Sequence, residues 1–523
     1  MVRLIKVHVH ISFRHPISTS PEWRQIKHYR SLTTLTMYGV AAVLLVVTSS
    51  TNVLPVTRAY TLVYPRLLEE RRQDGELVLH VTDELVLNLQ KSSIAAPLLR
   101  VVRYENDKHV TSLHKGEEFD GSLYHSRNKF ASVHVFRAGD SVEVEGIIGP
   151  YKRIEPMPAM ARTTDGRIAH VVHDIEADKA PNTGSFDYEF APRNGISATN
   201  TGKPQYVPAT VEVELFVTVD TFHSKHFRNT TKLIVYVCII VNTVNLWLAE
   251  TNQPRIQLLL TGVETSEGEP YLKSKGQFVS AEETIAELNN YATQNKERHG
   301  NPDILYLMSG RDLYGNRNGR QDRTLRGLGY NSGLCARYRV ALGEDKAGTY
   351  SGIDTAAHEI GHLLGATHDG SPPEPKYPGK PDSLMCPVYY GYLMSYFKRG
   401  PASHHYSSCS LAQMQYFVRR VTPSCWEVNA KKIYNVTKKY PGMTMTPEVY
   451  CQRLFPHEQN VTADPFEWFK TTCMVRCLYN PSGEVVHTGR AMYKDVEALE
   501  YTPCGQGKAC IQGICTEKSR RSP

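Results

Sequence analysis

Apolar and polar residues alternate in short stretches between residues 60 and 200 of this 523-residue chain. The alternation is clearest at residues 76–81 and 141–145, and a period of two is typical of strands with one buried face. Residues 178–210 are rich in Pro, Gly, Asn and Ser, which is typical of an exposed linker. We therefore expect a separate β-rich unit that ends in a linker.

From residue 211 onward, strand-like and helix-like segments take turns. Ser280, with Glu283 three residues later, predicts a helix that begins near Ala281. Strands are expected at residues 211–219, 255–260, 303–308, 338–342 and, as an irregular glycine-rich edge, 326–333. This order predicts an α/β (α+β) domain with a mixed, mostly parallel five-stranded sheet, followed by the helix that carries the candidate chemistry.

Two apolar runs need an interpretation of their own. Residues 233–249 resemble a membrane span, but Asn242, Thr243 and Asn245 interrupt the run, so we expect a buried helix beside the sheet. Residues 37–47 form a shorter run of 11 residues, and Ala59 follows as a small residue at a possible cleavage site. The shorter run predicts a signal peptide rather than an anchor in the mature protein, with translation starting at Met37.

Composition and cysteine usage point to a secreted globular protein. With 41% hydrophobic and 22% charged residues, and a net charge of +7 spread thinly, the chain gives no support to wholesale disorder or nucleic-acid binding. Such a length suggests two to four folded units.

All 11 cysteines fall at or after Cys238. Six of them crowd the C-terminal end: Cys451, Cys473, Cys477, Cys504, Cys510 and Cys515. This density of cysteines predicts disulfides and therefore an oxidising compartment. Sequons at Asn229, Asn435 and Asn460 fit a glycoprotein.

The candidate chemistry lies in residues 358–369, which read HEIGHLLGATHD. His358 and His362 are four residues apart, so on a helix their imidazoles share one face and can bind one zinc ion. Gly365 can take a positive φ and end the helix, which would turn the chain back and bring His368 in as the third ligand. Three protein ligands leave one position open for water, as catalytic zinc requires.

Glu359 is the candidate general base, because it stands beside the metal ligands without being one of them. We expect zinc to lower the pKa of its bound water to about 7, and Glu359 to take the proton as that water attacks a peptide carbonyl. A structural zinc site is the less favoured alternative, since it needs four closed ligands and no cysteine lies within the motif.

These residues resemble a known family. The run HEIGHLLGATHD resembles the extended zinc signature of metzincin proteases, and Asp369 after the third histidine resembles the reprolysin (adamalysin) branch. The resemblance implies a methionine turn beneath the zinc, with Met394 favoured over Met385. Tyr396 resembles instead a tyrosine of the astacin and serralysin branches that contacts zinc or the oxyanion, so its role stays open.

The same resemblance implies two disulfides, Cys335–Cys425 and Cys386–Cys409, and leaves Cys238 as a buried thiol. A calcium site also occurs in reprolysins. Glu214 and Asp303 stand at matching positions, and the third ligand is open between Glu427 and Asn429.

The resemblance implies that the chain is divided into four parts. They are an N-terminal extension with signal peptide (1–59), a propeptide (60–207), a reprolysin-like catalytic domain (208–429) and a cysteine-rich domain (430–523). The propeptide has no cysteine, so a thiol switch cannot silence the zinc. The cleavage site and the pairing of the six C-terminal cysteines stay open.

The whole chain looks most like the reprolysins secreted in tick saliva, which implies a monomeric zinc endopeptidase acting on extracellular host proteins such as fibrinogen and fibronectin. The alternative is a catalytically silent secreted protein that binds through its cysteine-rich module. Loss of Glu359 or of a ligand would favour that alternative, and the sequence keeps all four residues.

Overall fold

A computed structural model describes most of the chain from Tyr60 to Lys518. The described residues are 60–71, 76–105, 108–139, 141–175, 203–265, 268–317, 320–374, 377–397, 400–427, 440–465, 470–480, 492–511 and 513–518. They belong to one compact unit. The expected signal peptide with Met37, most of the linker, and Asn429 and Asn435 lie outside the described residues.

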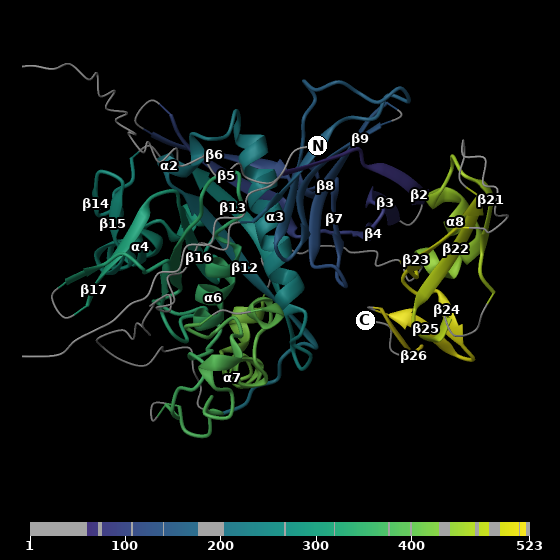
Figure 1. The fold of residues 1–523 in the computed structure, drawn as a ribbon. Helices are drawn as coiled ribbons and strands as arrows, with labels where there is room; N and C mark the ends of the chain where they lie inside the picture. Colours follow the sequence, from purple (N-terminus) through teal and green to yellow (C-terminus); the bar gives the residue numbers. More distant parts are fainter. Residues whose placement is uncertain are drawn as a thin grey trace, which may run out of the picture. The chain divides into compact units, whose positions relative to one another are not determined.

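A seven-stranded sheet forms the centre of the fold (Figure 1), in the order β19-β20-β16-β12-β13-β5-β6. Its parallel middle is made of β12 (Thr210–Val219), β13 (Arg255–Thr265), β16 (Ile304–Ser309) and β20 (Val340–Glu344). The glycine-rich β19 (Gly327–Gly329) pairs antiparallel with β20 at one end. At the other end β5 (Ala95–Glu105) runs parallel to β13, and β6 (Lys108–Lys115) runs antiparallel to β5.

The expectation of a separate N-terminal unit beside a five-stranded sheet is therefore corrected. Five strands do come from residues 210–344, but β5 and β6 extend their sheet by two strands from the N-terminal segment. The alternating pattern marks a strand and its buried face, whereas the choice of partner depends on which sheet edge offers free N–H and C=O groups. That choice leaves little trace in a single sequence.

Helix α3 (Thr230–Leu248) follows β12 and is buried along most of its length. Its N-cap is Asn229, whose side chain accepts a hydrogen bond from the Lys232 N–H. Among the described residues, α3 is the one helix long and apolar enough to span a membrane, and 83% of its most apolar window is buried inside the protein. It is a core helix, as expected, and Cys238 lies buried within it.

Helix α4 (Ala281–Gln294) begins where the sequence predicts it, but without the expected side-chain cap. Ser280 is the N-cap residue, yet its side chain makes no capping hydrogen bond. Instead, Oε1 of Glu282 accepts a hydrogen bond from the N–H of Asn316. The acidic first turn of α4 thus binds the neighbouring strand β17 (Asp312–Arg317) instead of closing a capping box.

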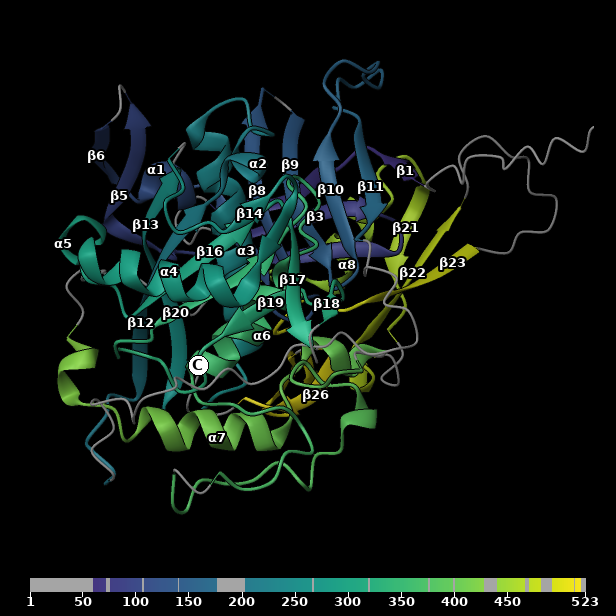
Figure 2. The ribbon, with the colours of Figure 1, turned by 90° about the vertical axis from the view of Figure 1, so that its left-hand side faces the viewer.

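The other helices and small strands frame the sheet. Figure 2 shows α7 running beyond one end of the strands, where Met414 and Phe417 join the main core. The remaining α-helices and strands of this part are α1 (Glu117–Asp120), α2 (Thr221–Ser224), α5 (Lys296–His299), α6 (Ile353–Leu363), α7 (Ser408–Val418), β14 (Ser274–Lys275), β15 (Phe278–Ser280), β17 (Asp312–Arg317) and β18 (Arg320–Asp322).

The rest of the N-terminal segment forms a nine-stranded sheet in the order β1-β11-β10-β9-β8-β7-β4-β3-β2. Its strands are β1 (Tyr60–Val63), β2 (Arg66–Arg71), β3 (Glu76–Thr82), β4 (Leu85–Lys91), β7 (Leu123–Ser126), β8 (Ala131–Ala138), β9 (Ser141–Gly149), β10 (Lys152–Pro156) and β11 (His170–Asp174). Leucines and valines on alternate positions of these strands form its core. The segment is thus built of strands, in keeping with its alternating pattern.

The C-terminal part is small and held by disulfides. It contains α8 (Pro447–Leu454), a sheet of β21 (Gln459–Ala463), β22 (Met474–Asn480) and β23 (Met492–Glu497), and a second sheet of β24 (Pro503–Gly505), β25 (Lys508–Ile511) and β26 (Ile514–Glu517). The disulfides are Cys451–Cys477, Cys473–Cys510 and Cys504–Cys515. Cross-links supply the stability that so small a core cannot.

Candidate metal centre

Helix α6 carries the first two candidate ligands. It begins at Ile353, and its N-cap is Gly352, whose N–H donates to Oδ1 of Asp345 at 2.7 Å. The first N–H of this turn is therefore bound by a carboxylate from outside the helix rather than by a side chain of α6. The cap fixes the end of α6 against the strand β20 that precedes it.

Gly365 ends the helix as the sequence predicts. Its φ is +98°, in the region that favours glycine, and the N–H groups of Gly365 and Ala366 still donate back to the carbonyls of His362 and Gly361. A Cβ at position 365 would also lie 2.6 Å from Cβ of Phe417, so a larger residue would not fit. The chain therefore turns at this point, which brings His368 back towards the helix.

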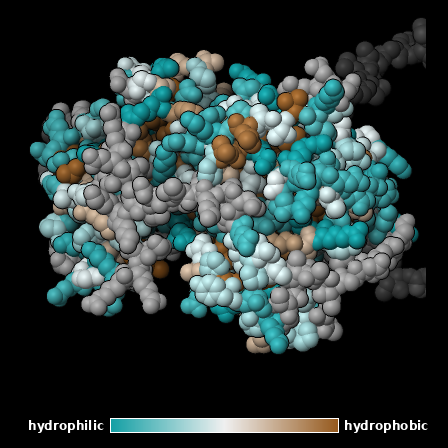
Figure 3. Space-filling model, turned by 180° about the vertical axis from the view of Figure 1, so that it is seen from behind, coloured by the Kyte–Doolittle hydropathy of each residue, from teal (hydrophilic) through white to brown (hydrophobic). Residues whose placement is uncertain are grey.

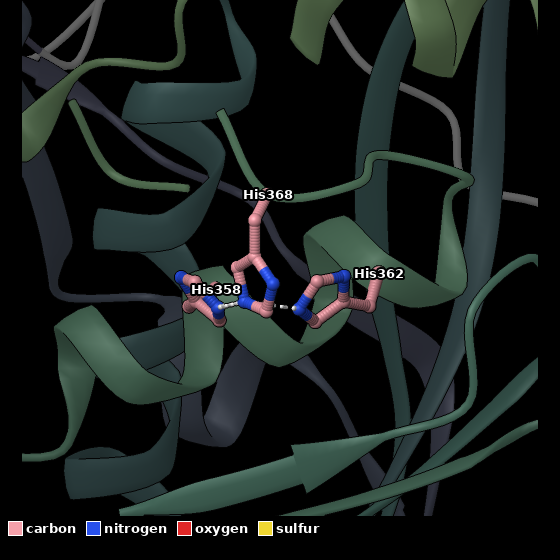
Figure 4. A group of neighbouring side chains, drawn as sticks. All are labelled: His358, His362 and His368. Atoms are coloured by element: carbon pink, nitrogen blue, oxygen red, sulfur yellow. Dashed lines mark hydrogen bonds between the residues drawn. The ribbon is translucent and has the colours of Figure 1, made fainter. Parts of the chain in front are cut away.

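The three histidines meet at one point (Figure 4). Nε2 of His368 lies 3.2 Å from Nε2 of His358 and 3.2 Å from Nε2 of His362. Nδ1 of His358 donates to the carbonyl oxygen of Leu393 at 2.7 Å, and Nδ1 of His362 donates to that of Ala366 at 2.8 Å. Because a carbonyl can only accept, both protons sit on Nδ1 and both Nε2 lone pairs face the centre.

This arrangement fits a zinc ion. Nitrogen ligands at about 2.0–2.1 Å from a tetrahedral zinc lie roughly 3.3–3.4 Å apart, close to the spacing seen here. All three rings are buried, with exposed fractions of 5% or less. The backbone carbonyls that hold two of the rings are the outer partners that orient histidine ligands in metal sites.

Glu359 is buried beside the histidines, with 2% of its surface exposed. The glycines of β19 make room for its carboxyl group. A Cβ at position 327 would lie 2.6 Å from Oε1 of Glu359, and a Cβ at position 329 would lie 3.1 Å from Oε2. The sequence shows this glycine-rich edge but gives no sign that it lines the space of the glutamate.

Asp369 connects the third histidine to the turn that follows. Its N–H donates to the carbonyl of Met394, and its carboxylate accepts from the hydroxyls of Ser395 at 2.9 Å and Ser407 at 2.6 Å. Burial raises the pKa of the Asp369 carboxyl, and these hydroxyl donors work against that rise. Met394 is fully buried and lies against the helix between the first two histidines, since a Cβ at Gly361 would be 2.8 Å from its Sδ, whereas Met385 is 86% exposed.

Tyr396 lies against His368, the third candidate ligand. Its ring centroid is 4.3 Å from that of His368, with the planes inclined at 38°. This packing alone would restrain the histidine ring.

The other predicted site residues are also placed by the structure. Cys335–Cys425 and Cys386–Cys409 form disulfides, the pairing that the resemblance implies. Asp303 and Glu214 come together, since Oδ2 of Asp303 accepts from the N–H of Glu214 at 2.8 Å. Burial raises the pKa of Asp303 to about 8.

One polar cluster behind the helix is missed by the sequence reasoning. Asp345 is 3% exposed, and its Oδ2 lies 2.6 Å from Nε2 of His223 and accepts from the hydroxyl of Tyr236 at 2.7 Å. Its other oxygen caps Gly352 at the start of α6. These residues are far apart in the chain and belong to no motif, so only the fold reveals that they position the helix.

The site combines two histidines on one helix, a third histidine after a glycine turn, a buried glutamate and a buried methionine beside the helix. Together these features define a metallopeptidase. Comparison with known proteins supports a narrower class. Residues 209–407 match the reprolysin model of metallo-peptidase family M12, and this match supports a reprolysin-type metallopeptidase.

Curated relatives share this class. The chain is 28% identical over 370 residues to the Bombyx mori protein "A disintegrin and metalloproteinase with thrombospondin motifs like", covering 66% of this chain and 51% of that protein. It is 26% identical to the venom metalloproteinase antarease-like TtrivMP_A of Tityus trivittatus, covering 54% and 74%, and 25% identical to the venom metalloproteinase BumaMPs1 of Olivierus martensii, covering 65% and 85%. The chain thus spans about half the length of the silk-moth relative.

A solved structure, metalloproteinase-II from Bacteroides fragilis, matches with a TM-score of 0.31 at 13% identity, covering 64% of this chain and 88% of that one. This likeness is too low to bear on the fold.

Proposed function

We propose that this chain is a secreted, zinc-dependent endopeptidase that hydrolyses peptide bonds of extracellular proteins. The observation that carries the proposal is the convergence of three buried histidines, with Nε2 of His368 lying 3.2 Å from Nε2 of both His358 and His362, on a helix that also carries the buried Glu359. His358, His362 and His368 would hold one zinc ion. When bound, zinc activates a water molecule and polarises the scissile carbonyl.

Glu359 is the proposed general base and acid. Its carboxylate takes a proton from the attacking water and then delivers that proton to the nitrogen of the leaving amine. Because water is the proposed nucleophile, the reaction proceeds without an acyl-enzyme. Burial among the β19 glycines keeps the carboxyl group in one position, which a proton transfer of this kind requires.

Matrix or clotting proteins such as fibrinogen and fibronectin are the proposed substrates. Support comes from the names of the relatives, two of which are venom metalloproteinases, and from the disulfide-rich C-terminal part, which suits an extracellular protein. We further propose that residues 60–207 are a propeptide and 430–523 a cysteine-rich domain of a monomeric, glycosylated protein, with a calcium ion at Asp303 and Glu214.

The hydroxyl of Tyr396 is proposed to be dispensable for turnover, since the ring itself packs on His368. Tyr396→Phe keeps that ring, so zinc content and kcat should stay within about twofold of wild type. A loss of tenfold or more in kcat with zinc retained would instead assign the hydroxyl to the oxyanion.

Purified mature protein tested on fibrinogen and gelatin, with and without a zinc chelator, checks the function. The chelator should abolish cleavage, and added zinc should restore it. Glu359→Ala should keep one zinc per chain and lose at least about a hundredfold in kcat. Cleavage that resists the chelator would refute the mechanism, and a wild type without activity but with zinc bound would favour the non-enzymatic binding protein.

A further inference from the structure

Helix α3 is covered on both of its sides. On one side it packs against β13 and α6, and on the other against α1, β7, β8 and β9 of the N-terminal segment. Fifteen of its 19 residues are buried, including Ile239, Ile240 and Trp247. A helix that is apolar all round needs cover all round. The N-terminal segment supplies that cover for one of its faces.

The same segment also closes one edge of the central sheet. β5 pairs in parallel with β13, where Val101 stands opposite Val263 and Val102 opposite Glu264. Ile94, Leu99 and Ile147 belong to the same core as the residues of α3 and β13. Without β5, the N–H and C=O groups along β13 would form an open edge.

Polar contacts fix the register of the joint between the N-terminal segment (residues 60–175) and α3. The hydroxyl of Ser132 donates to the carbonyl of Ile239 at 3.2 Å and accepts from the side-chain amide of Asn242 at 2.9 Å. Nζ of Lys232 lies 2.8 Å from Oε1 of Glu145. The Ser132 bonds are buried, and buried, satisfied polar groups specify one way of docking, while the Lys232–Glu145 pair lies at the partly exposed rim.

A second joint connects the segment to the disulfide-rich C-terminal part. Leu68 and Val78 share a core cluster with Tyr450 and Cys451. The guanidinium of Arg66 donates to the backbone carbonyl of Arg453 at 2.7 Å and to that of Leu454 at 2.8 Å. The guanidinium of Arg453 donates in return to the carbonyl of Leu68 at 2.6 Å. The segment is thus held at two places that do not depend on each other.

We propose that residues 60–175 stay bound as a non-covalent subunit after the linker is cut, with the β13 edge and the outer face of α3 as the receiving surface. Release would expose a strand edge and an apolar helix face together, and exposed surfaces of that kind lead to aggregation. The face of the molecule in Figure 3 is mostly hydrophilic, with hydrophobic residues in separate spots, so an uncovered α3 would be unlike the surface seen there. Retention is a matter of binding and does not rest on peptidase activity.

The test uses the full chain with a site for a sequence-specific protease inserted between residues 183 and 200, in the Glu359→Ala background so that the chain cannot cut itself. After cleavage, both pieces should elute together at micromolar concentration in size-exclusion chromatography. Backbone amides of residues 258–265 should keep their protection from hydrogen exchange. Separation of the two pieces, or precipitation of the C-terminal piece on cutting, would overturn the proposal.

A charge reversal locates the joint. Glu145→Lys faces Lys232 with a like charge and should raise the dissociation constant of the cut complex about fivefold at low salt. The double variant with Lys232→Glu restores an opposite pair and should bring the constant back to within about twofold. Arg162→Ala is the control, because this exposed guanidinium donates to the carbonyl of Gly166 within its own segment. No rescue in the double variant would place the joint elsewhere and overturn the assigned surface.

Discussion

The sulfur of Met394 lies directly against Gly361 of the helix that carries the first two histidines. A Cβ at position 361 would be 2.8 Å from Sδ of Met394, 3.2 Å from the ring of Tyr406 and 3.4 Å from Cε of Met414. The glycine between the two histidines therefore has a reason in packing, since the helix can approach the methionine turn only where it has no side chain.

Gly361→Ala should displace the methionine turn and with it the carbonyl of Leu393 that orients His358. We expect a loss of about 1–3 kcal/mol in stability, which is typical of overpacking, together with weaker zinc binding. Thermal unfolding and a zinc-competition titration measure the two effects. Met394→Leu nearly conserves volume and should lose less than about 1.5 kcal/mol. Equal effects of the two substitutions would contradict the packing argument.

Gly327→Ala should impair turnover without removing the metal, because its Cβ would lie 2.6 Å from Oε1 of Glu359. A carboxylate displaced by about 1 Å can lower the rate by on the order of a hundredfold, so kcat should fall ten- to a hundredfold. Zinc content and KM should stay close to wild type. Gly268→Ala is the control, since its Cβ would meet only the ring of Tyr104 at an ordinary 3.5 Å. A variant with unchanged kcat would show that the carboxylate has room to spare.

The metal centre is the part of the molecule that sequence predicts best. Histidine spacing on a helix determines which side chains share a face, and the positive φ of Gly365 follows from local stereochemistry. Both arguments use residues that are close together in the chain. The sequence also shows that β19 is rich in glycine, but only the position of β19 beside α6 explains why.

Long-range pairings could not be predicted in the same way. The join of β5 to β13 brings together residues more than 150 positions apart, and nothing in the alternating pattern of either strand selects the other. The cluster of Asp345 with His223 and Tyr236 could not be predicted either, because the sequence does not show whether an aspartate is buried or exposed. Such clusters depend on the finished fold.

Asp345→Ala should destabilise the protein strongly, because it leaves His223 and Tyr236 buried without their shared acceptor and removes the cap from Gly352. Each buried donor that is left without its acceptor costs about 1–3 kcal/mol. Thermal unfolding with zinc present measures the loss. Asp165→Ala, at an exposed turn in the N-terminal segment, should leave the unfolding temperature unchanged. Similar unfolding of Asp345→Ala and wild type would show that water replaces the lost carboxylate.

Acid should weaken the joint between the N-terminal segment and α3. His134 on β8 is 1% exposed and packs on the ring of Phe136. Its Nδ1 lies 3.8 Å from Oε1 of Glu145. The same Glu145 oxygen is bound by Lys232 of α3. Burial, and then the charge of Lys232, lowers the pKa of His134 to about 4. The folded protein therefore favours the neutral ring, which puts the pH-sensitive range below the ordinary histidine pKa of about 6.5.

The sign of the effect follows from proton uptake. Between pH 6.5 and 4 the unfolded chain binds a proton at His134 that the folded chain does not, so this stabilising contribution is full above about pH 6.5 and is lost as the pH falls. From pH 7 to pH 5 the loss is about 2 kcal/mol. His134→Asn has no such proton, so its stability deficit relative to wild type should shrink by about that amount over the same range in chemical denaturation. A deficit that stays constant between pH 7 and 5 would mean that His134 titrates alike in both states, and that acid acts on this joint through other groups.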